Sequence, residues 1–79
     1  MKFVIVEKKE VKKRWKFAKL HATNLKNFNE AKTEFKKIIK KYIKSGQFKY
    51  YDIGDTYFEF YNFNSLVEKA RRIELKSIL

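Results

Sequence analysis

Hydrophobic and polar residues alternate along the chain in two rhythms, which predict its strands and helices. Residues 2–7 (KFVIVE) are a short apolar run rich in β-branched side chains, which is typical of a strand. The charged residues 7–10 are expected to form a turn. Residues 11–22 alternate between apolar and basic side chains, which predicts a second strand. Residues 1–23 are therefore predicted to form a basic β-hairpin.

The second strand of this hairpin has an apolar face and a cationic face. Val11, Trp15 and Phe17 share the apolar face. The cations of the other face are Lys12, Arg14 and Lys16. The phase slips at Phe17-Ala18, and Ala18, Leu20 and Ala22 then continue the apolar face. One extra residue in a β-bulge explains such a slip. Trp15 is expected to anchor the core, and base stacking is its alternative role.

A helical period begins at residue 28. Asn27 and Glu30 have the spacing of a capping box, in which the Asn27 side chain accepts from a backbone N–H of the first turn and the Glu30 side chain reaches back. The apolar residues of the following segment occupy one arc of a helix: Phe28, Ala31, Phe35, Ile38, Ile39, Tyr42 and Ile43. Ser45-Gly46 is a typical helix end. Residues 28–45 are therefore predicted to be an amphipathic helix.

Residues 47–63 are predicted to form an aromatic β-hairpin, with Gly54-Asp55 as a two-residue turn in which the glycine supplies an unusual φ. This turn places Tyr51, Ile53, Phe58 and Phe60 on one face. The other face carries Asp52 and Glu59 and four aromatic residues that we expect to form a protein interface: Phe48, Tyr50, Tyr57 and Tyr61.

A second helix is predicted at residues 65–78. Ser65 and Glu68 have capping-box spacing, and Leu66, Ala70 and Ile73 share a helical face. A terminal strand is the alternative, because residues 73–79 also alternate loosely. The element order is then ββαββα, an α+β fold with a four-stranded, mainly antiparallel sheet and two helices packed on it.

The composition is that of one small, folded, basic domain spanning residues 1–79. Hydrophobic residues make up 44% of the chain and fourteen residues are aromatic, which supports a thin core. The absence of cysteine excludes disulfides and thiolate metal sites. The apolar run at residues 3–6 is too short for a signal peptide or a membrane span, so a cytoplasmic location is expected, in a host cell if the protein is viral. Abundant Lys, Asn, Ile, Phe and Tyr are typical of a low-GC genome, such as a bacterium, phage or other mobile element.

The net charge of +11 is unevenly distributed. Residues 8–19 carry seven bases and one acid, whereas residues 47–65 carry one base and three acids. Like charges repeated along one strand face repel each other unless a partner compensates them, and phosphate is the commonest such partner. The predicted nucleic-acid contacts are Lys8, Lys9, Lys12, Lys13, Arg14, Lys16, Lys19, Lys36, Lys37, Lys40, Lys41 and Lys44.

These patterns favour a small nucleic-acid-binding protein, with RNA preferred over DNA and weak sequence specificity, because Lys lacks the planar fork of Arg. One alternative is an inhibitor of phage or plasmid type that binds a host or defence protein or a ribonucleoprotein. A weaker alternative is a toxin-like ribonuclease using His21, the single histidine. No catalytic residue, metal, cofactor or membrane is expected, and a protein partner or homodimer could use the Tyr-rich hairpin.

Overall fold

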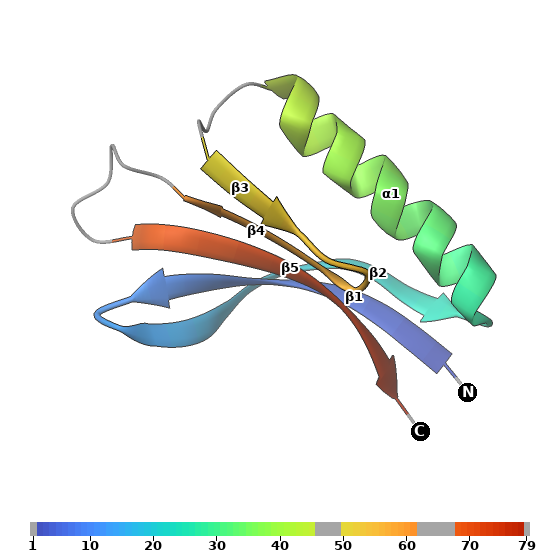
Figure 1. The fold of residues 1–79 in the computed structure, drawn as a ribbon. Coiled ribbons are helices and arrows are strands. Elements are labelled where there is room, and N and C mark those ends of the chain that lie inside the picture. The colour runs from blue at the N-terminus through green and yellow to red at the C-terminus, as the bar shows by residue number, and fades with distance from the viewer. Residues whose placement is uncertain (1, 46–49, 62–67, 79) are drawn as a thin grey trace.

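The sheet has five strands, and one helix lies against it. The computed structural model describes residues 2–45, 50–61 and 68–78 (Figure 1). Its elements in chain order are β1 (Lys2–Val11), β2 (Arg14–Leu25), α1 (Phe28–Ser45), β3 (Tyr50–Ile53), β4 (Tyr57–Tyr61) and β5 (Glu68–Ile78). The strands are ordered β2-β1-β5-β4-β3 and every neighbouring pair is antiparallel. The predicted ββαββα fold with four strands and two helices is therefore wrong.

The error lies in the last segment, because Glu68–Ile78 is the central strand of the sheet and not a helix. β5 pairs with β1 along its length and with β4 on its other side. Ala70 and Ile73 share a face on a helix, but on this strand they point to opposite sides of the sheet. The alternation of buried Ile73 and Leu75 with Arg72 and Glu74 is the signal of a strand. The alternative of a terminal strand is confirmed up to Ile78, and the predicted cap at Ser65 lies outside the described residues.

The turn of the first hairpin lies at Lys12-Lys13 and not at the predicted residues 7–10, which belong to β1. Val11 pairs with Arg14, and the two lysines between them have φ angles of 53° and 66°. Two consecutive left-handed residues define a type I′ turn, whose twist matches that of the flanking strands. The structure thus places non-glycine residues where Asn-Gly is favoured.

The predicted bulge at Phe17-Ala18 is confirmed. Lys19 pairs with Glu7 and Phe17 pairs with Lys8, which leaves Ala18 as the extra residue. Two further register shifts follow along β2, and Asn24, near the last of them, has a φ of 59°. These insertions bend β2 at the edge of the sheet.

The core lies between α1 and one face of the sheet. From the helix, Ala31, Phe35 and Ile39 are buried, as their spacing predicted. From the sheet they meet further buried side chains, which are Ile5, Leu25, Phe58, Phe60, Ile73 and Leu75. The predicted cap at Asn27 is confirmed, since Glu30 N–H donates to Asn27 Oδ1 at 2.8 Å. Glu30 also reaches back, but its Oε2 accepts from Lys26 N–H at 3.2 Å, one residue before the cap. α1 ends at Ser45 as predicted, and Gly46 lies outside the described residues.

The second hairpin has the predicted faces but a different turn. Tyr51 pairs with Phe60 and Ile53 with Phe58, so the two apolar pairs lie on the same side as α1. The backbone N–H of Gly54 donates to the carbonyl of Tyr57 at 2.9 Å, which centres the turn one residue later than predicted. Gly54 does not need a left-handed φ. It needs space, because an added Cβ would overlap the ring of Tyr57.

Replacing Lys13 by glycine should stabilise the protein by about 0.5–1 kcal/mol, because glycine adopts the left-handed conformation without steric cost. Chemical denaturation of Lys13→Gly measures this gain. Lys13→Ala is the matched control, since it removes the same charge but keeps a Cβ, and it should give no stabilisation. Equal gains from both variants would show that charge, and not backbone conformation, limits the turn.

Candidate nucleic-acid interface

A buried carboxylate joins the helix to the sheet. Glu7 on β1 is fully buried and accepts hydrogen bonds from three different elements. His21 Nε2 of β2 lies 2.7 Å from Glu7 Oε1, and the hydroxyl of Tyr42 on α1 donates to the same oxygen at 2.6 Å. Arg71 of β5 donates from its guanidinium to Glu7 Oε2. Glu7 therefore fixes the C-terminal half of α1 over the sheet.

The surroundings of Glu7 favour its ionised form. Burial by itself raises the pKa of Glu7, but the hydrogen bonds from Tyr42, Arg71 and His21 and the charge of Arg71 outweigh it and hold that pKa below its ordinary value. Burial and the neighbouring Glu7 carboxylate raise the pKa of the Tyr42 hydroxyl. Tyr42 is therefore a neutral donor at physiological pH. Because Glu7 is ionised, the Nε2 of His21 carries the proton that it donates.

A cleft opens beside this cluster, between α1 and β2. Its volume is about 390 Å³, which is in the range of small-ligand sites. The floor includes His21 and Tyr42, two of the residues that bind Glu7. The remaining lining residues are Lys19, Glu34, Ile38, Lys41 and Ser45. The cleft thus has a cation on each wall, Lys19 from β2 and Lys41 from α1.

Further cations of β1 and β2 share the α1 side of the sheet with Lys19. Residues directly opposite each other in antiparallel strands point to the same face. Lys16 pairs with Lys9, Arg14 pairs with Val11, and Lys19 pairs with Glu7, whose side chain meets Tyr42 of α1. Lys12 and Lys13 are exposed in the turn at the far end of this row. Figure 1 shows the turn between β1 and β2 at the end of the sheet opposite the chain termini.

The helix lysines divide between its two sides. Lys37, Lys41 and Lys44 follow Glu34 at helical spacing, on the side of α1 that lines the cleft. Lys36 and Lys40 lie around the helix from them, toward the side where Lys32 Nζ donates to the carbonyl of Asp55 at 2.7 Å. We call the following set the basic rim of the cleft: Lys9, Arg14, Lys16, Lys19, Lys37, Lys41 and Lys44. Among the described residues, no ion pair involves a member of the basic rim.

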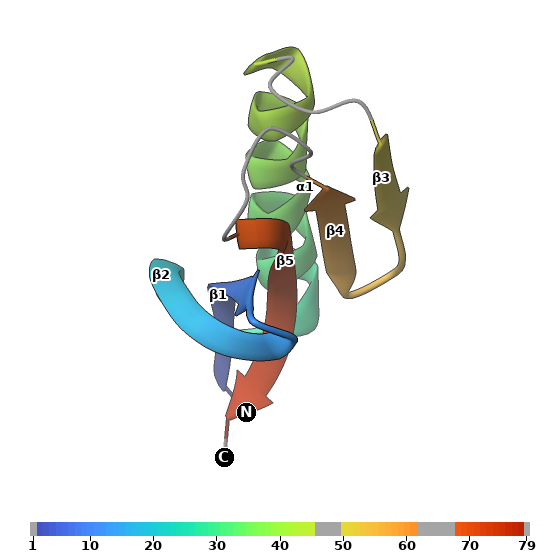
Figure 2. The same cartoon turned by 90° about the vertical axis from the view of Figure 1, so that its left-hand side faces the viewer.

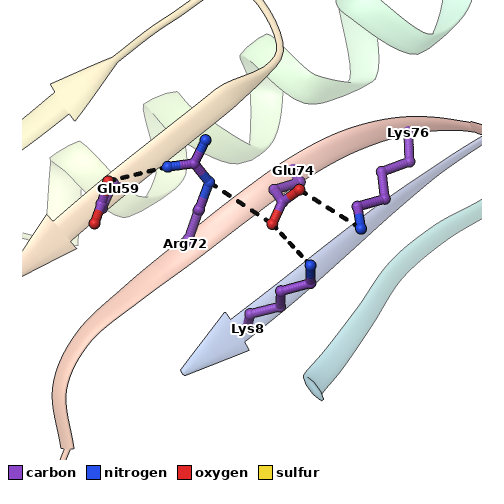
Figure 3. A network of polar contacts seen from close by, with 5 residues as sticks. All are labelled: Lys8, Glu59, Arg72, Glu74 and Lys76. Atoms are coloured by element: carbon purple, nitrogen blue, oxygen red, sulfur yellow. Dashed lines mark hydrogen bonds and ion pairs between the residues drawn. The ribbon is translucent and has the colours of Figure 1, made fainter. Parts of the chain in front are cut away.

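Lys8 does not belong to this surface. It points to the side of the sheet away from α1 and forms an ion pair with Glu74 at 3.1 Å (Figure 3). The structure thus places Lys9, Arg14, Lys16 and Lys19 on the α1 side of the sheet, and Lys19 lines the cleft. It separates Lys8, Lys36 and Lys40 from them. Sequence spacing could not make this division because it depends on which face of the sheet α1 covers.

The aromatic residues of the first hairpin lie opposite to their predicted position. Trp15 and Phe17 were expected in the core, but they are 41% and 65% exposed. They pair with Glu10 and Lys8 on the face that α1 does not cover. β2 contacts the core through Ala22 and Leu25, and this apolar contact ends at the bulges. Beyond them, the cations of β2 occupy the α1 side instead. The prediction that Trp15 anchors the core is wrong.

The Tyr-rich face of the second hairpin also lies away from α1. The Tyr57 ring lies under the guanidinium of Arg72, 4.4 Å from its Cζ, and its hydroxyl donates to Asp52 at 3.0 Å. Tyr61 is half-buried on the same face. Of the other predicted interface residues, Phe48 and the side chain of Tyr50 lie outside the described part of the structure.

His21 has no carboxylate close to it along the chain, yet Glu7 is its hydrogen-bond partner. The two residues are fourteen positions apart and meet across the β1–β2 pair. A glutamate in the otherwise apolar run KFVIVE was the available signal, because a buried acid needs donors on the elements around it. Arg71 was not recognised as a partner of Glu7 because its segment was predicted to be a helix.

The stabilisation provided by Glu7 should disappear in acid. Because its pKa is lowered on folding, the contribution is complete above its ordinary pKa of 4.5 and is lost as pH falls through the lower folded value. We expect Glu7→Gln to be less stable than the natural protein by about 3–5 kcal/mol at neutral pH, and this difference should shrink below pH 4.5. Chemical denaturation across pH measures it.

Glu34→Gln, which removes a carboxylate outside the cluster, is the control and should leave the acid dependence unchanged. Tyr42→Phe removes one donor to Glu7 and should cost about 1–2 kcal/mol, so it reports on the cluster even if Glu7→Gln does not fold. A constant difference between Glu7→Gln and the natural protein from neutral to acid pH would contradict the role of the carboxylate.

The described part of the chain offers few other kinds of site. No three His, Asp or Glu side chains among residues 2–45, 50–61 and 68–78 come together as metal ligands. The helix described here, α1, is too rich in lysine to cross a bilayer. No family model, curated protein or solved structure matches the chain. Its function must be inferred from its own residues.

Proposed function

We propose that the protein binds single-stranded nucleic acid, RNA in preference to DNA, along the basic rim and the cleft between α1 and β2. One observation carries this proposal. Cations lie on both walls of one cleft, and among the described residues these cations form no ion pair. Such cations repel one another, and phosphates relieve the repulsion while releasing their condensed counterions.

The shape of the site supports a single strand. A cleft of about 390 Å³ accommodates a nucleotide but not a duplex. Lys19 and Lys41 stand on opposite walls, so they suit the phosphates on either side of one nucleotide. Since these cations are lysines, which act as point charges, the proposed binding has little sequence specificity.

The preference for RNA rests on the other polar groups of the cleft. The Glu34 carboxylate can accept a hydrogen bond from a ribose 2′-hydroxyl, and the Ser45 hydroxyl also lines the cleft. The 2′-hydroxyl is the group by which proteins distinguish RNA from DNA at a given site. Glu34→Ala, which removes both acceptor oxygens, should therefore narrow the difference in affinity between an RNA and the DNA of the same sequence.

Neutralising part of the basic rim should flatten the salt dependence of binding. The triple variant Arg14→Gln, Lys16→Gln and Lys19→Gln should reduce the slope of log K against log salt by roughly 2, because each lost phosphate contact on a single strand removes about 0.7. Fluorescence anisotropy of a labelled single-stranded RNA over a salt series measures the slope.

A second triple variant is the control. Lys26→Gln, Lys36→Gln and Lys40→Gln lower the net charge by the same amount, but these lysines are not in the basic rim. This variant should keep most of the natural slope. Equal slopes for the two variants would show that binding follows overall charge, and the proposed site would then be incorrect.

One observation favours a second candidate function, ribonuclease activity. His21 lines the cleft, and its Nε2–H donates a hydrogen bond to Glu7, which leaves the lone pair of Nδ1 to act as a general base. It would remove the proton of a ribose 2′-hydroxyl as that oxygen bonds to phosphorus. The bond from phosphorus to the 5′-oxygen breaks, and solvent protonates the leaving oxygen.

Incubation of RNA with the natural protein and with His21→Gln separates binding from cleavage. Cleavage products that end in a 2′,3′-cyclic phosphate and vanish with His21→Gln would support catalysis. Intact RNA that is nevertheless bound by both proteins would leave nucleic-acid binding as the function and remove the ribonuclease.

A further inference from the structure

One whole face of the sheet is not covered by α1, and half of it is apolar. We call this side, away from α1, the open face. In Figure 2, which views the molecule from the hairpin end, α1 lies on one side of the sheet. On the open face, Trp15, Phe17 and Leu20 of β2 are 41%, 65% and 49% exposed. Val4 and Val6 of β1 extend the same patch between them and β5.

The other half of the open face is polar, and its charged side chains pair with one another. Figure 3 shows a row of alternating charges that crosses three strands. Glu74 of β5 pairs with Lys8 at 3.1 Å and with Lys76 and Arg72 at 3.7 Å. Arg72 also reaches Glu59 of β4 at 3.1 Å. These ion pairs offset most of the charge of the network, whose three bases and two acids leave one positive charge in excess.

The charged side chains that the structure describes on the open face balance one another. Its ionisable side chains, placed by the strand register among the described residues, are Lys2, Lys8, Arg72 and Lys76 against Glu10, Asp52, Glu59 and Glu74. Four bases meet four acids on this face of a chain whose net charge is +11. The excess positive charge therefore lies elsewhere, much of it on the basic rim.

We propose that a second copy of this chain covers the open face and forms a twofold symmetric dimer. A twofold interface is self-complementary, so the apolar half of one copy meets the apolar half of the other. Two molecules of this net charge repel each other in most orientations, but they can approach through a neutral face without that penalty. An exposed apolar patch bordered by polar residues is typical of such an interface.

The face is large enough for a stable dimer. The two larger dimensions of the molecule are 38 and 25 Å, and the smallest is 17 Å. A sheet surface bounded by the larger two can supply the about 800 Å² that a standard interface buries on each partner. Packing two open faces also gives a small domain with a thin core a second apolar layer.

This dimer would place the two clefts on opposite outer surfaces, because each cleft lies on the α1 side of its own sheet. The dimer proposal does not depend on nucleic-acid binding. If both proposals are correct, one dimer binds two segments of the same nucleic-acid strand. Binding of the first segment then raises the effective concentration of the second and so strengthens its binding.

Sedimentation equilibrium over a range of protein concentrations tests the dimer. The natural protein should reach the dimer mass, and the double variant Phe17→Thr, Leu20→Thr should stay monomeric. Both side chains are exposed in the monomer, so the variant should still fold. Ile43→Thr with Ile53→Thr is the control, because these residues are comparably exposed, at 40% and 47%, but lie on the α1 side. The control should dimerise like the natural protein.

Trp15 gives a readout that needs no substitution. It is the single tryptophan of the chain and lies on the open face. Its fluorescence should shift to shorter wavelength and resist quenching by acrylamide as the protein concentration rises. High salt should leave this shift intact while it weakens RNA binding, so a failed dimer and a failed nucleic-acid site give different results.

The proposal is overturned if the natural protein remains monomeric at all concentrations and acrylamide quenches Trp15 equally throughout. The open face would then be available to a different protein, as an inhibitor would require. A dimer that persists in the Phe17→Thr, Leu20→Thr variant overturns it as well, because the contact would then lie elsewhere.

Discussion

The ionised carboxylate of Glu7 is the constraint on which the rest of the structure depends. It is buried in a thin two-layer fold, and its donors come from β2, α1 and β5. Removing a charge of this kind from water is costly unless it is fully hydrogen-bonded. The donors therefore fix one end of α1 at a set position over the sheet. That position opens the cleft beside His21 and Tyr42 and decides which cations surround it.

Because α1 covers only one face of the sheet, the two faces carry different kinds of side chain. On the α1 side, apolar residues fill the middle of the sheet and cations of β2 extend beyond the helix. On the open face, charges pair with one another across the strands, and aromatic side chains remain exposed. The same chain thus carries a surface suited to a polyanion and a surface suited to a neutral, apolar partner, on opposite sides.

The sequence predicted those elements whose local signals agree with the final packing. Helix α1, its cap at Asn27 and the bulge at Ala18 each follow from a few neighbouring residues. β5 was missed because ARRIEL is compatible with a helix in isolation, and only its pairing with β1 and β4 makes it a strand. The faces of β2 were inverted because an alternating strand shows two faces but not which one a helix covers. The Glu7 cluster combines residues from four elements, β1, β2, α1 and β5, so no local pattern could reveal it.

The outer edge of β2 shows a further consequence of its lysines. A strand at the border of a sheet exposes backbone groups that can pair with strands of other molecules, and charged side chains are a common protection against such growth. β2 is a long border strand, and its cations keep like-charged copies from aligning along it. Substitutions that remove these charges should therefore lower the solubility of the protein.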